Sequence, residues 1–202
     1  RKVVAESATA KLNGAIVGQI NQDLIALNGS RSNVSNLSFS VGQMAGYYTA
    51  TINKLLGLFA LVVQDSNDPA ISLKGSALLA LLEAKEKSGI ERAMGANGFG
   101  SGAFQPAIAT NFVNLISQQQ AFFLSFRHLA EDRYLRLLDA VMNSPQNAEV
   151  ERLRDIARAS FVTGDLQGVT GPQWFKASTD RIDLLYNVEQ QISENLTALA
   201  EE

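Results

Sequence analysis

Apolar residues recur at helical spacing along most of the chain, and proline marks the breaks between the periodic segments. Proline is tolerated at the first position of a helix, because its missing N–H has no partner inside the helix. A further helix start is expected near Ser32, after the break at Gly29 and Ser30. The pattern predicts helices at roughly 2–28, 32–66, 69–96, 106–142, 145–159 and 172–201.

The segment from 106 to 142 shows how these helices should pack. Its apolar positions repeat at heptad spacing, which favours antiparallel packing at shallow angles, and a break is expected near Glu131 and Asp132, where apolar residues become sparse. Alternating strand patterns are missing. The sequence therefore predicts an all-α protein, an elongated antiparallel helical bundle, with residues 1–202 as a single domain in which two stacked bundles share long helices.

Composition narrows the class of protein. The chain of 202 residues is 46% hydrophobic and 18% charged, which is enough apolar material for a real core. A net charge of -3 gives no basic surface, so no nucleic-acid partner is expected. The longest apolar run, LLGLFALVV at 55–63, is about half of the ~20 residues that a bilayer crossing needs, and it is interpreted as a core helix. Neither end carries a signal peptide, so any membrane segment would lie outside this sequence.

Motifs for catalysis or metal binding are weak. His128 is the single histidine and there is no cysteine, so no metal site and no cofactor are expected. GANGFGSGAF at 95–104 resembles a phosphate loop only superficially, because it follows a helix and lacks the lysine, and it is interpreted as a flexible turn with left-handed glycines. Glu131, Asp132 and the acids of VERLRDIAR are interpreted as solvated helix faces. We expect no catalytic residues and no enzyme.

Two charged groups do stand out from this background. In EAKEKSGIERA, Lys85, Ser88 and Arg92 lie on one helical face, where two cations and a hydroxyl could meet a small anion. A stripe through positions 79, 82, 86, 89 and 93 places Glu86 toward the core.

Arg181 is the second anomaly, because it interrupts the apolar stripe of the last helix, which runs from Trp174 through Ser178 and Leu185. A buried guanidinium needs a carboxylate or an anion from solution as its partner. Two alternatives follow. Either Glu86, Asp180 or Asp183 pairs with Arg181 or Arg92, or the arginines bind a small anion.

Two segments, LLEAKEKSGIERAMGANGFGSGAF at 81–104 and QWFKASTDRIDLLYNVEQQI at 173–192, resemble the nitrate- and nitrite-sensing (NIT) domain of bacterial receptors. YYTATINKLLGL and FVNLISQQQAFFLSF support the resemblance, which spans most of residues 31–199. It implies a helical sensor in the periplasm, between two transmembrane helices of a chemoreceptor, histidine kinase or cyclase. The family's first-helix motif, glutamate-arginine-glycine, has no counterpart here, because Arg1 and Arg31 are the only earlier arginines. That first helix is therefore expected to be missing.

The resemblance implies that nitrate or nitrite is held between helices by arginines. By position these are Arg92 and Arg181, which we expect to face one another and share the anion, with Lys85, Ser88 and Ser178 as further candidate ligands. A homodimer in the full receptor is expected, attached to the membrane through segments outside this sequence. The alternative is a helical protein-interaction or scaffold module in which both arginines are structural.

Overall fold

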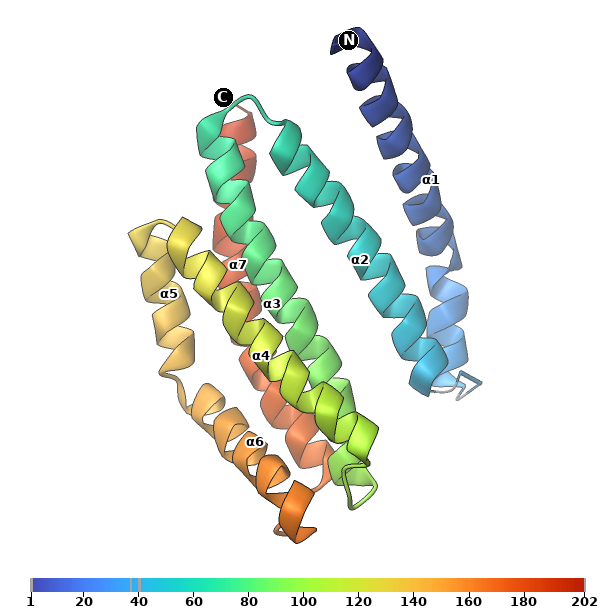
Figure 1. The fold of residues 1–202 in the computed structure, drawn as a ribbon, viewed down its shortest axis with the longest axis vertical. Helices are drawn as coiled ribbons and strands as arrows, with labels where there is room; N and C mark the ends of the chain where they lie inside the picture. The colour runs from blue at the N-terminus through green and yellow to red at the C-terminus, as the bar shows by residue number, and fades with distance from the viewer. Residues whose placement is uncertain (1, 37, 40, 202) are drawn as a thin grey trace. The chain divides into compact units, whose positions relative to one another are not determined.

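The computed structural model describes residues 2–36, 38–39 and 41–201, with side chains given from residue 14 onward except at 41 and 42. Arg1 lies outside the described residues. Within them the chain forms helices and no strand, which confirms the all-α prediction. The helices are α1 (Lys2–Ser35), α2 (Val41–Asp65), α3 (Pro69–Gly100), α4 (Pro106–Leu129), α5 (Asp132–Met142), α6 (Pro145–Thr163) and α7 (Gly171–Ala200) (Figure 1). They divide into two compact units, 1–65 and 66–202.

The first unit is the pair α1 and α2. The predicted break at Gly29 and Ser30 is wrong, because α1 continues through both residues to Ser35. A helix interior tolerates single glycines at a cost of about 1 kcal/mol, so glycine alone does not end it. Asp23 ties the two helices together: its carboxylate lies 2.7 Å from Lys54 Nζ, and its carbonyl accepts a hydrogen bond from the hydroxyl of Tyr47.

Helix α2 contains the apolar run at 55–63, which the sequence pattern predicted to be a core helix. Within 55–63 only Leu56 and Val63 are buried, whereas Leu55 and Val62 are exposed. Among the described residues, Gln43–Asp65 is the one stretch long and apolar enough to cross a bilayer, judged by length and composition alone. One such helix is weak evidence for a membrane span, because helices of water-soluble proteins pass the same test.

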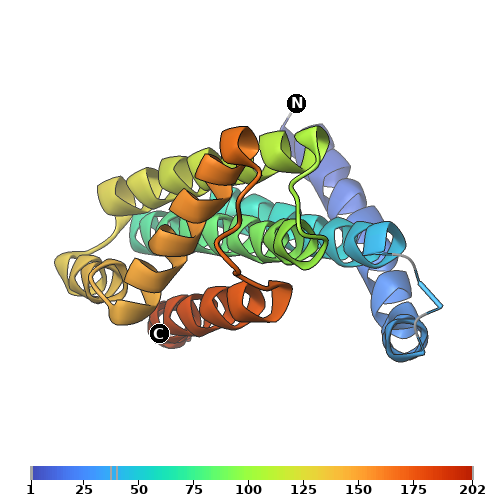
Figure 2. The same ribbon diagram turned by 90° about the horizontal axis from the view of Figure 1, so that it is seen from below.

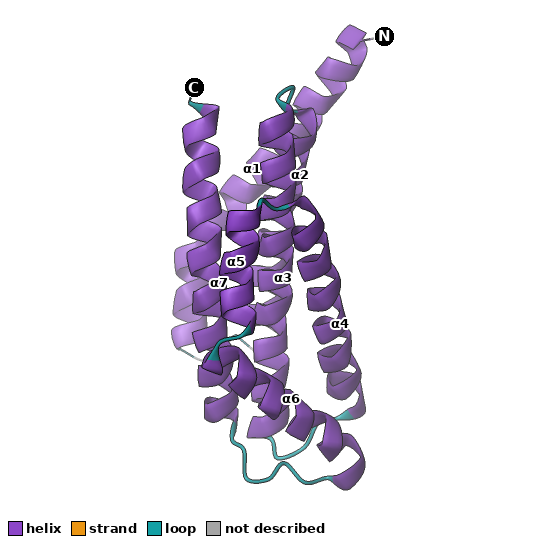
Figure 3. Cartoon of the chain, turned by 90° about the vertical axis from the view of Figure 1, so that its left-hand side faces the viewer, coloured by secondary structure: helices purple, strands orange, loops and turns teal. Residues whose placement is uncertain are grey.

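The second unit is a bundle built around α3, which packs along both α4 and α7. Figures 2 and 3 show α6 lying across the lower part of this bundle and α5 beside α7. Contacts between α3 and α7 run in opposite order along the two helices, since Lys74 meets Asn195 near one end and Gly95 meets Trp174 near the other. The two helices are therefore antiparallel, as predicted.

Aromatic rings fill the lower half of this bundle. Trp174 is fully buried and packs against Phe99 and Phe112, with ring centroids 5.7 and 5.3 Å away. Its indole N–H donates to the carbonyl of Arg92 at 2.9 Å. Gly95 makes room for it, because a Cβ built there would come within 2.2 Å of the indole nitrogen. This contact fixes the register of α7 against α3 at the level of Arg92.

The starts of the helices in this unit follow from their capping residues. All four prolines lie in the first turn of a helix, as predicted. The side chains of Asp68, Ser144 and Thr170 accept hydrogen bonds from the free backbone N–H groups of α3, α6 and α7, which satisfies donors that a helix start leaves unpaired. The predicted break near Glu131 is confirmed, because α4 ends at Leu129 and α5 begins at Asp132.

The glycine-rich stretch after residue 95 differs from its prediction. Helix α3 continues to Gly100, and Gly98 and Phe99 are buried within it. A Cβ at position 98 would overlap the ring of Phe104, so this glycine allows close packing. Of the glycines in 95–104, Gly102 alone has a positive φ, +76°. The left-handed turn is therefore confined to a single residue, and the preceding glycines belong to the helix core.

Candidate functional site

Helix α3 turns a stripe of small residues toward the bundle interior, and this register decides which charges are buried. The buried positions are Gly75, Ala77, Leu78, Ala80, Leu81, Ala84, Ser88, Glu91, Gly95, Gly98 and Phe99. The predicted stripe through 79, 82, 86, 89 and 93 is wrong, because those residues are only half-buried. Small side chains allow α4 and α7 to approach closely on the face that carries Leu78 and Leu81, and the predicted Leu79 and Leu82 lie one position further round the helix. The buried acid is therefore Glu91 and not Glu86.

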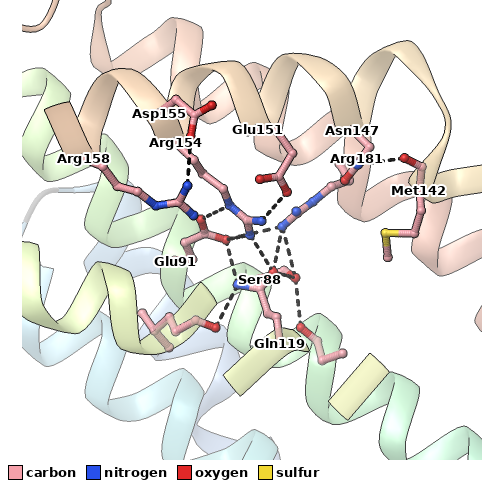
Figure 4. A network of polar contacts seen from close by, with 12 residues as sticks. Ser88, Glu91, Gln119, Met142, Asn147, Glu151, Arg154, Asp155, Arg158 and Arg181 are labelled. Carbon is pink, nitrogen blue, oxygen red and sulfur yellow. Dashed lines mark hydrogen bonds and ion pairs between the residues drawn. The ribbon is translucent and has the colours of Figure 1, made fainter. Parts of the chain in front are cut away.

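Five polar side chains from four helices meet in the core, and we call them the buried polar cluster. They come from α3, α4, α6 and α7, and each is only 1–3% exposed: Ser88, Glu91, Gln119, Arg154 and Arg181 (Figure 4). Buried polar groups are costly unless they are hydrogen-bonded, so the contacts within the cluster determine whether the core is stable.

Arg154 of α6 is the best-satisfied cation of the cluster. Its Nε and Nη2 donate to the two carboxylate oxygens of Glu91 at 2.7 and 2.6 Å, a two-bond pair that reaches from α6 to α3. Nη1 donates to Glu151 at 2.6 Å. Burial lowers the pKa of this guanidinium, but the hydrogen bonds and charge of Glu91, with the help of Glu151, outweigh burial and raise the pKa above its usual value.

Arg181 of α7 is much less well satisfied. Its contacts all start from Nη2, which donates to the carbonyl of Gln119 at 2.8 Å, to Glu91 at 3.3 Å and to Ser88 at 3.4 Å. Burial and the charge of Arg154 lower the pKa of Arg181 to about 10. Its Nε has no hydrogen-bond partner among the described residues, and neither does the buried hydroxyl of Ser178 one helical turn earlier. Arg181 and Ser178 thus present free donors in the core.

The structure brings two of the five predicted ligands into contact, namely Ser88 and Arg181. Ser178 precedes Arg181 by one turn of α7 and is buried, as predicted from the apolar stripe of the last helix.

The other two predicted ligands have partners outside the cluster. Lys85 pairs with Glu189 of α7 and lies over the ring of Tyr186. Arg92 donates to the hydroxyl of Thr179 at 2.9 Å and stacks on Phe175. Burial lowers the pKa of both Lys85 and Arg92. Arg92 and Arg181 share no hydrogen-bond partner in the described contacts.

Arg92 lies on the flank of the α3–α7 contact, next to the aromatic side chains of α7. For Arg92, the charge of exposed Asp183 partly offsets the effect of burial on the pKa. The anticipated carboxylate partner of Arg181 is present, but it is Glu91 and none of the three acids considered from the sequence.

Three members of the cluster were not predicted from the sequence as site residues: Glu91, Gln119 and Arg154. Arg154 lies among acids that were interpreted as a solvated face. That interpretation fits Asp155, which is exposed, but Glu151 is half-buried beside Arg154. The spacing of Val150, Arg154 and Ala157 contained a usable signal, since it places an arginine on the apolar stripe of α6, as Arg181 is placed in α7.

The charges of the cluster determine the chemistry it can support. Two guanidinium groups face one fully buried carboxylate, that of Glu91, while Glu151, which is 46% exposed, pairs with Arg154 from the edge of the cluster. The Nε of Arg181 and the hydroxyl of Ser178 are left without partners among the described residues, in a core of low dielectric. A small oxyanion would satisfy them, and guanidinium donors match the geometry of planar oxygens. Within the described residues no group of three histidine, aspartate or glutamate side chains could hold a metal ion.

Comparisons with known proteins agree with this chemistry. The chain is 30% identical over 171 residues to the nitrate regulatory protein of Klebsiella oxytoca, a match that covers 85% of this chain and 42% of the relative. It superposes on the structure of the NasR transcription antiterminator with a TM-score of 0.81 and 27% identity, covering 94% of this chain and 51% of that one. The chain thus spans about half the length of these relatives.

The family model described as nitrate and nitrite sensing matches residues 2–197, nearly the whole chain. The resemblance seen in 81–104 and 173–192 is thereby confirmed. The chain belongs to the NIT family of nitrate- and nitrite-sensing domains.

Proposed function

We propose that the second unit binds nitrate or nitrite at the buried polar cluster, with Arg181 as the central ligand and Ser88 and Ser178 as hydroxyl donors. The observation that carries this proposal is the unsatisfied state of Arg181, whose Nε has no partner among the described residues while its pKa is lowered to about 10. An anion beside this guanidinium would offset the positive charge of Arg154 and occupy the free donors.

Arg154 joins the proposed ligand set as the second cation, and it is the residue that holds Glu91 in place. Arg92 remains a candidate ligand from the family resemblance, and Lys85 remains one from the helical face that it shares with Ser88 and Arg92. To contribute, Arg92 would have to leave Thr179, and Lys85 would have to leave Glu189. We therefore assign them a smaller share of the binding energy than Arg181.

The proposed output is a change in the packing of α7. This helix carries Arg181, and its contacts with α3 reach from Lys74 to Gly95. A ligand shifts such a packing only if it binds one arrangement better than the other. Because the chain spans about half of its relatives, we propose that α7 passes the change to an output module outside residues 1–202.

The cellular location of this sensor domain is also part of the proposal. The two relatives are called a regulatory protein and a transcription antiterminator, and neither name refers to a membrane receptor. Within the described residues, α2 gives weak local support to the periplasmic receptor expected from the resemblance. Fractionation of cells that express the full-length protein tests it, since a receptor would remain with the membranes.

The scaffold alternative is favoured by one observation, namely that Glu91 already forms ion pairs with Arg154 and Arg181. The two readings differ in their response to anions. If the cluster binds nitrate, sodium nitrate should raise the melting temperature above that in sodium chloride of equal ionic strength, since a ligand of the folded state stabilises by mass action.

Arg181→Ala should abolish that increment, and Arg181→Lys should weaken it, because an ammonium cannot copy the planar guanidinium. Arg152→Ala is the matched control, since Arg152 is an exposed arginine of α6 paired with Glu149. Titration calorimetry on the full-length protein with millimolar nitrate and nitrite decides the matter. If neither nitrate nor nitrite gives heat, the proposal is excluded and the scaffold alternative is favoured.

A further inference from the structure

Donors from three helices converge on the side-chain oxygen of Gln119. Ser88 Oγ of α3 lies 2.8 Å from this oxygen, Arg154 Nη2 of α6 lies 2.9 Å away, and Arg181 Nη2 of α7 lies 2.8 Å away (Figure 4). The oxygen is therefore the point at which both guanidinium groups of the cluster meet.

The orientation of this amide is fixed by its other end. Its Nε2 donates to Glu91 at 2.7 Å and to the carbonyl of Leu115 at 3.2 Å. Turning the amide over would place its oxygen against two acceptors and its NH2 group against two cations. The amide oxygen must therefore face the arginines.

A neutral oxygen is a poor partner for this position. An amide carbonyl has two lone pairs, and here two charged guanidinium donors approach it together with Ser88, whose single hydroxyl proton is shared with the carbonyl of Ala84. Hydrogen bonds from guanidinium to an ionised oxygen are roughly twice as strong as those between neutral groups. The oxygen of an anion would satisfy the same donors better than Gln119 does.

We infer that Gln119 is an internal occupant of the anion subsite: its side-chain oxygen takes the place of one ligand oxygen and must move away when nitrate or nitrite binds. This inference rests on the proposed function. The cluster is closed to solvent, so a ligand oxygen bonded to both Arg154 and Arg181 would need the position that the amide oxygen fills.

Displacement of the amide has two consequences. The free energy needed to break its contacts weakens the apparent affinity for the ligand, as for any site whose competent form is only partly populated. The same movement removes the bond from Gln119 to Glu91, which joins α4 to α3. Occupancy of the subsite is thereby linked to the packing of α4 as well as that of α7.

Calorimetric titration with sodium nitrate tests the inference on the full-length protein and its variants. Gln119→Ala removes the occupant, so the melting temperature without nitrate should fall while the Kd for nitrate tightens by about threefold to tenfold, the equivalent of one net hydrogen bond. Gln119→Asn withdraws the oxygen but keeps an amide, and it should change the Kd in the same direction. Gln119→Glu supplies a charged occupant and should weaken binding by at least about tenfold.

Gln120→Ala is the matched control, because Gln120 is the next residue of α4 and is exposed. It should change neither the Kd nor the melting temperature. Weaker or unchanged nitrate binding by Gln119→Ala and Gln119→Asn, with a wild type that binds, would overturn this inference alone. A wild type that gives no heat with nitrate or nitrite would overturn the proposed function and this inference together.

Discussion

Arg154 of α6 and Glu91 of α3 form a two-bond ion pair that links the two helices through their side chains, with N–O distances of 2.7 and 2.6 Å. Both side chains are almost fully buried. Such a pair adds little net stability over an apolar core, but the loss of one partner leaves a charge buried without compensation. The pair is therefore best tested by removing a single side chain.

Arg154→Ala should lower the free energy of unfolding by about 3 kcal/mol, because Glu91 would keep only its weaker contacts with Arg181 and Gln119. Arg152→Ala, which removes an exposed arginine two residues earlier, should change it by less than about 0.5 kcal/mol. Urea denaturation followed by circular dichroism gives both values. Equal losses in the two variants would contradict the buried pair.

Gly95→Ala should destabilise the protein by about 1–3 kcal/mol, since its Cβ would overlap the indole of Trp174 in a packed core. Gly89 lies in the same helix with no atom within 4 Å of a built Cβ. Gly89→Ala should therefore stabilise by about 0.5–1 kcal/mol through helix propensity alone. Thermal unfolding of the pair measures the difference, and a Gly95→Ala variant as stable as Gly89→Ala would refute the close contact.

Tyr134→Phe should stabilise the protein by about 1 kcal/mol at neutral pH, because the buried hydroxyl of Tyr134 makes no well-aligned hydrogen bond among the described residues, although the side chain of Arg133 lies near it. Tyr186→Phe is the control, since this ring is half-exposed. A loss of stability in Tyr134→Phe would reveal a partner for the hydroxyl.

The same variant makes a prediction about pH. Burial raises the pKa of the Tyr134 phenol, and the charge of Arg133 only partly offsets it. The folded state therefore holds this proton after the unfolded state has lost its own, so stability from this group falls as the pH rises above about 10. The advantage of Tyr134→Phe over the wild type should grow from pH 9 to pH 11 in denaturant titrations, whereas that of Tyr186→Phe should grow less.

Thr170→Ala should cost about 1 kcal/mol, because Thr170 and Gln173 form a capping box at the start of α7. Thr197 lies near the other end of the same helix, and its hydroxyl bonds only to the carbonyl of Ser193. Thr197→Ala should leave the stability unchanged or slightly raised, since alanine is the better helix former. A melting temperature that responds equally to both changes would argue against the cap.

The helices of the second unit could be predicted because their signals are local. Each proline sits in the first turn of its helix, and Asp68 and Ser144 supply caps at the adjoining position. The helix break predicted at Gly29 and Ser30 was wrong because local sequence signals do not decide the end of this helix. Contacts between α1 and α2, which no local pattern contains, decide whether a helix continues through a glycine.

The candidate site was predicted in part. Arg181 and Ser178 were found because α7 has a clear apolar stripe. Glu91 was missed because α3 is apolar on several faces and packs against two helices, so periodicity alone could not identify its buried face. Glu91 and Arg154 lie 63 residues apart in the sequence, so their pairing can be recognised only once the fold has brought the two side chains together.

Trp174 is the only tryptophan of the chain, and it is bonded to the carbonyl of Arg92, the residue that follows Glu91. Residues 1–202 therefore contain one tryptophan fluorophore, at the junction of α3 and α7, and no other tryptophan of these residues obscures its emission. A dry indole emits at shorter wavelength than a hydrated one, so a displacement that admits water to the α3–α7 contact would shift the emission spectrum to the red. Rapid-mixing fluorimetry of unlabelled residues 1–202 could thus time the proposed movement of α7 directly.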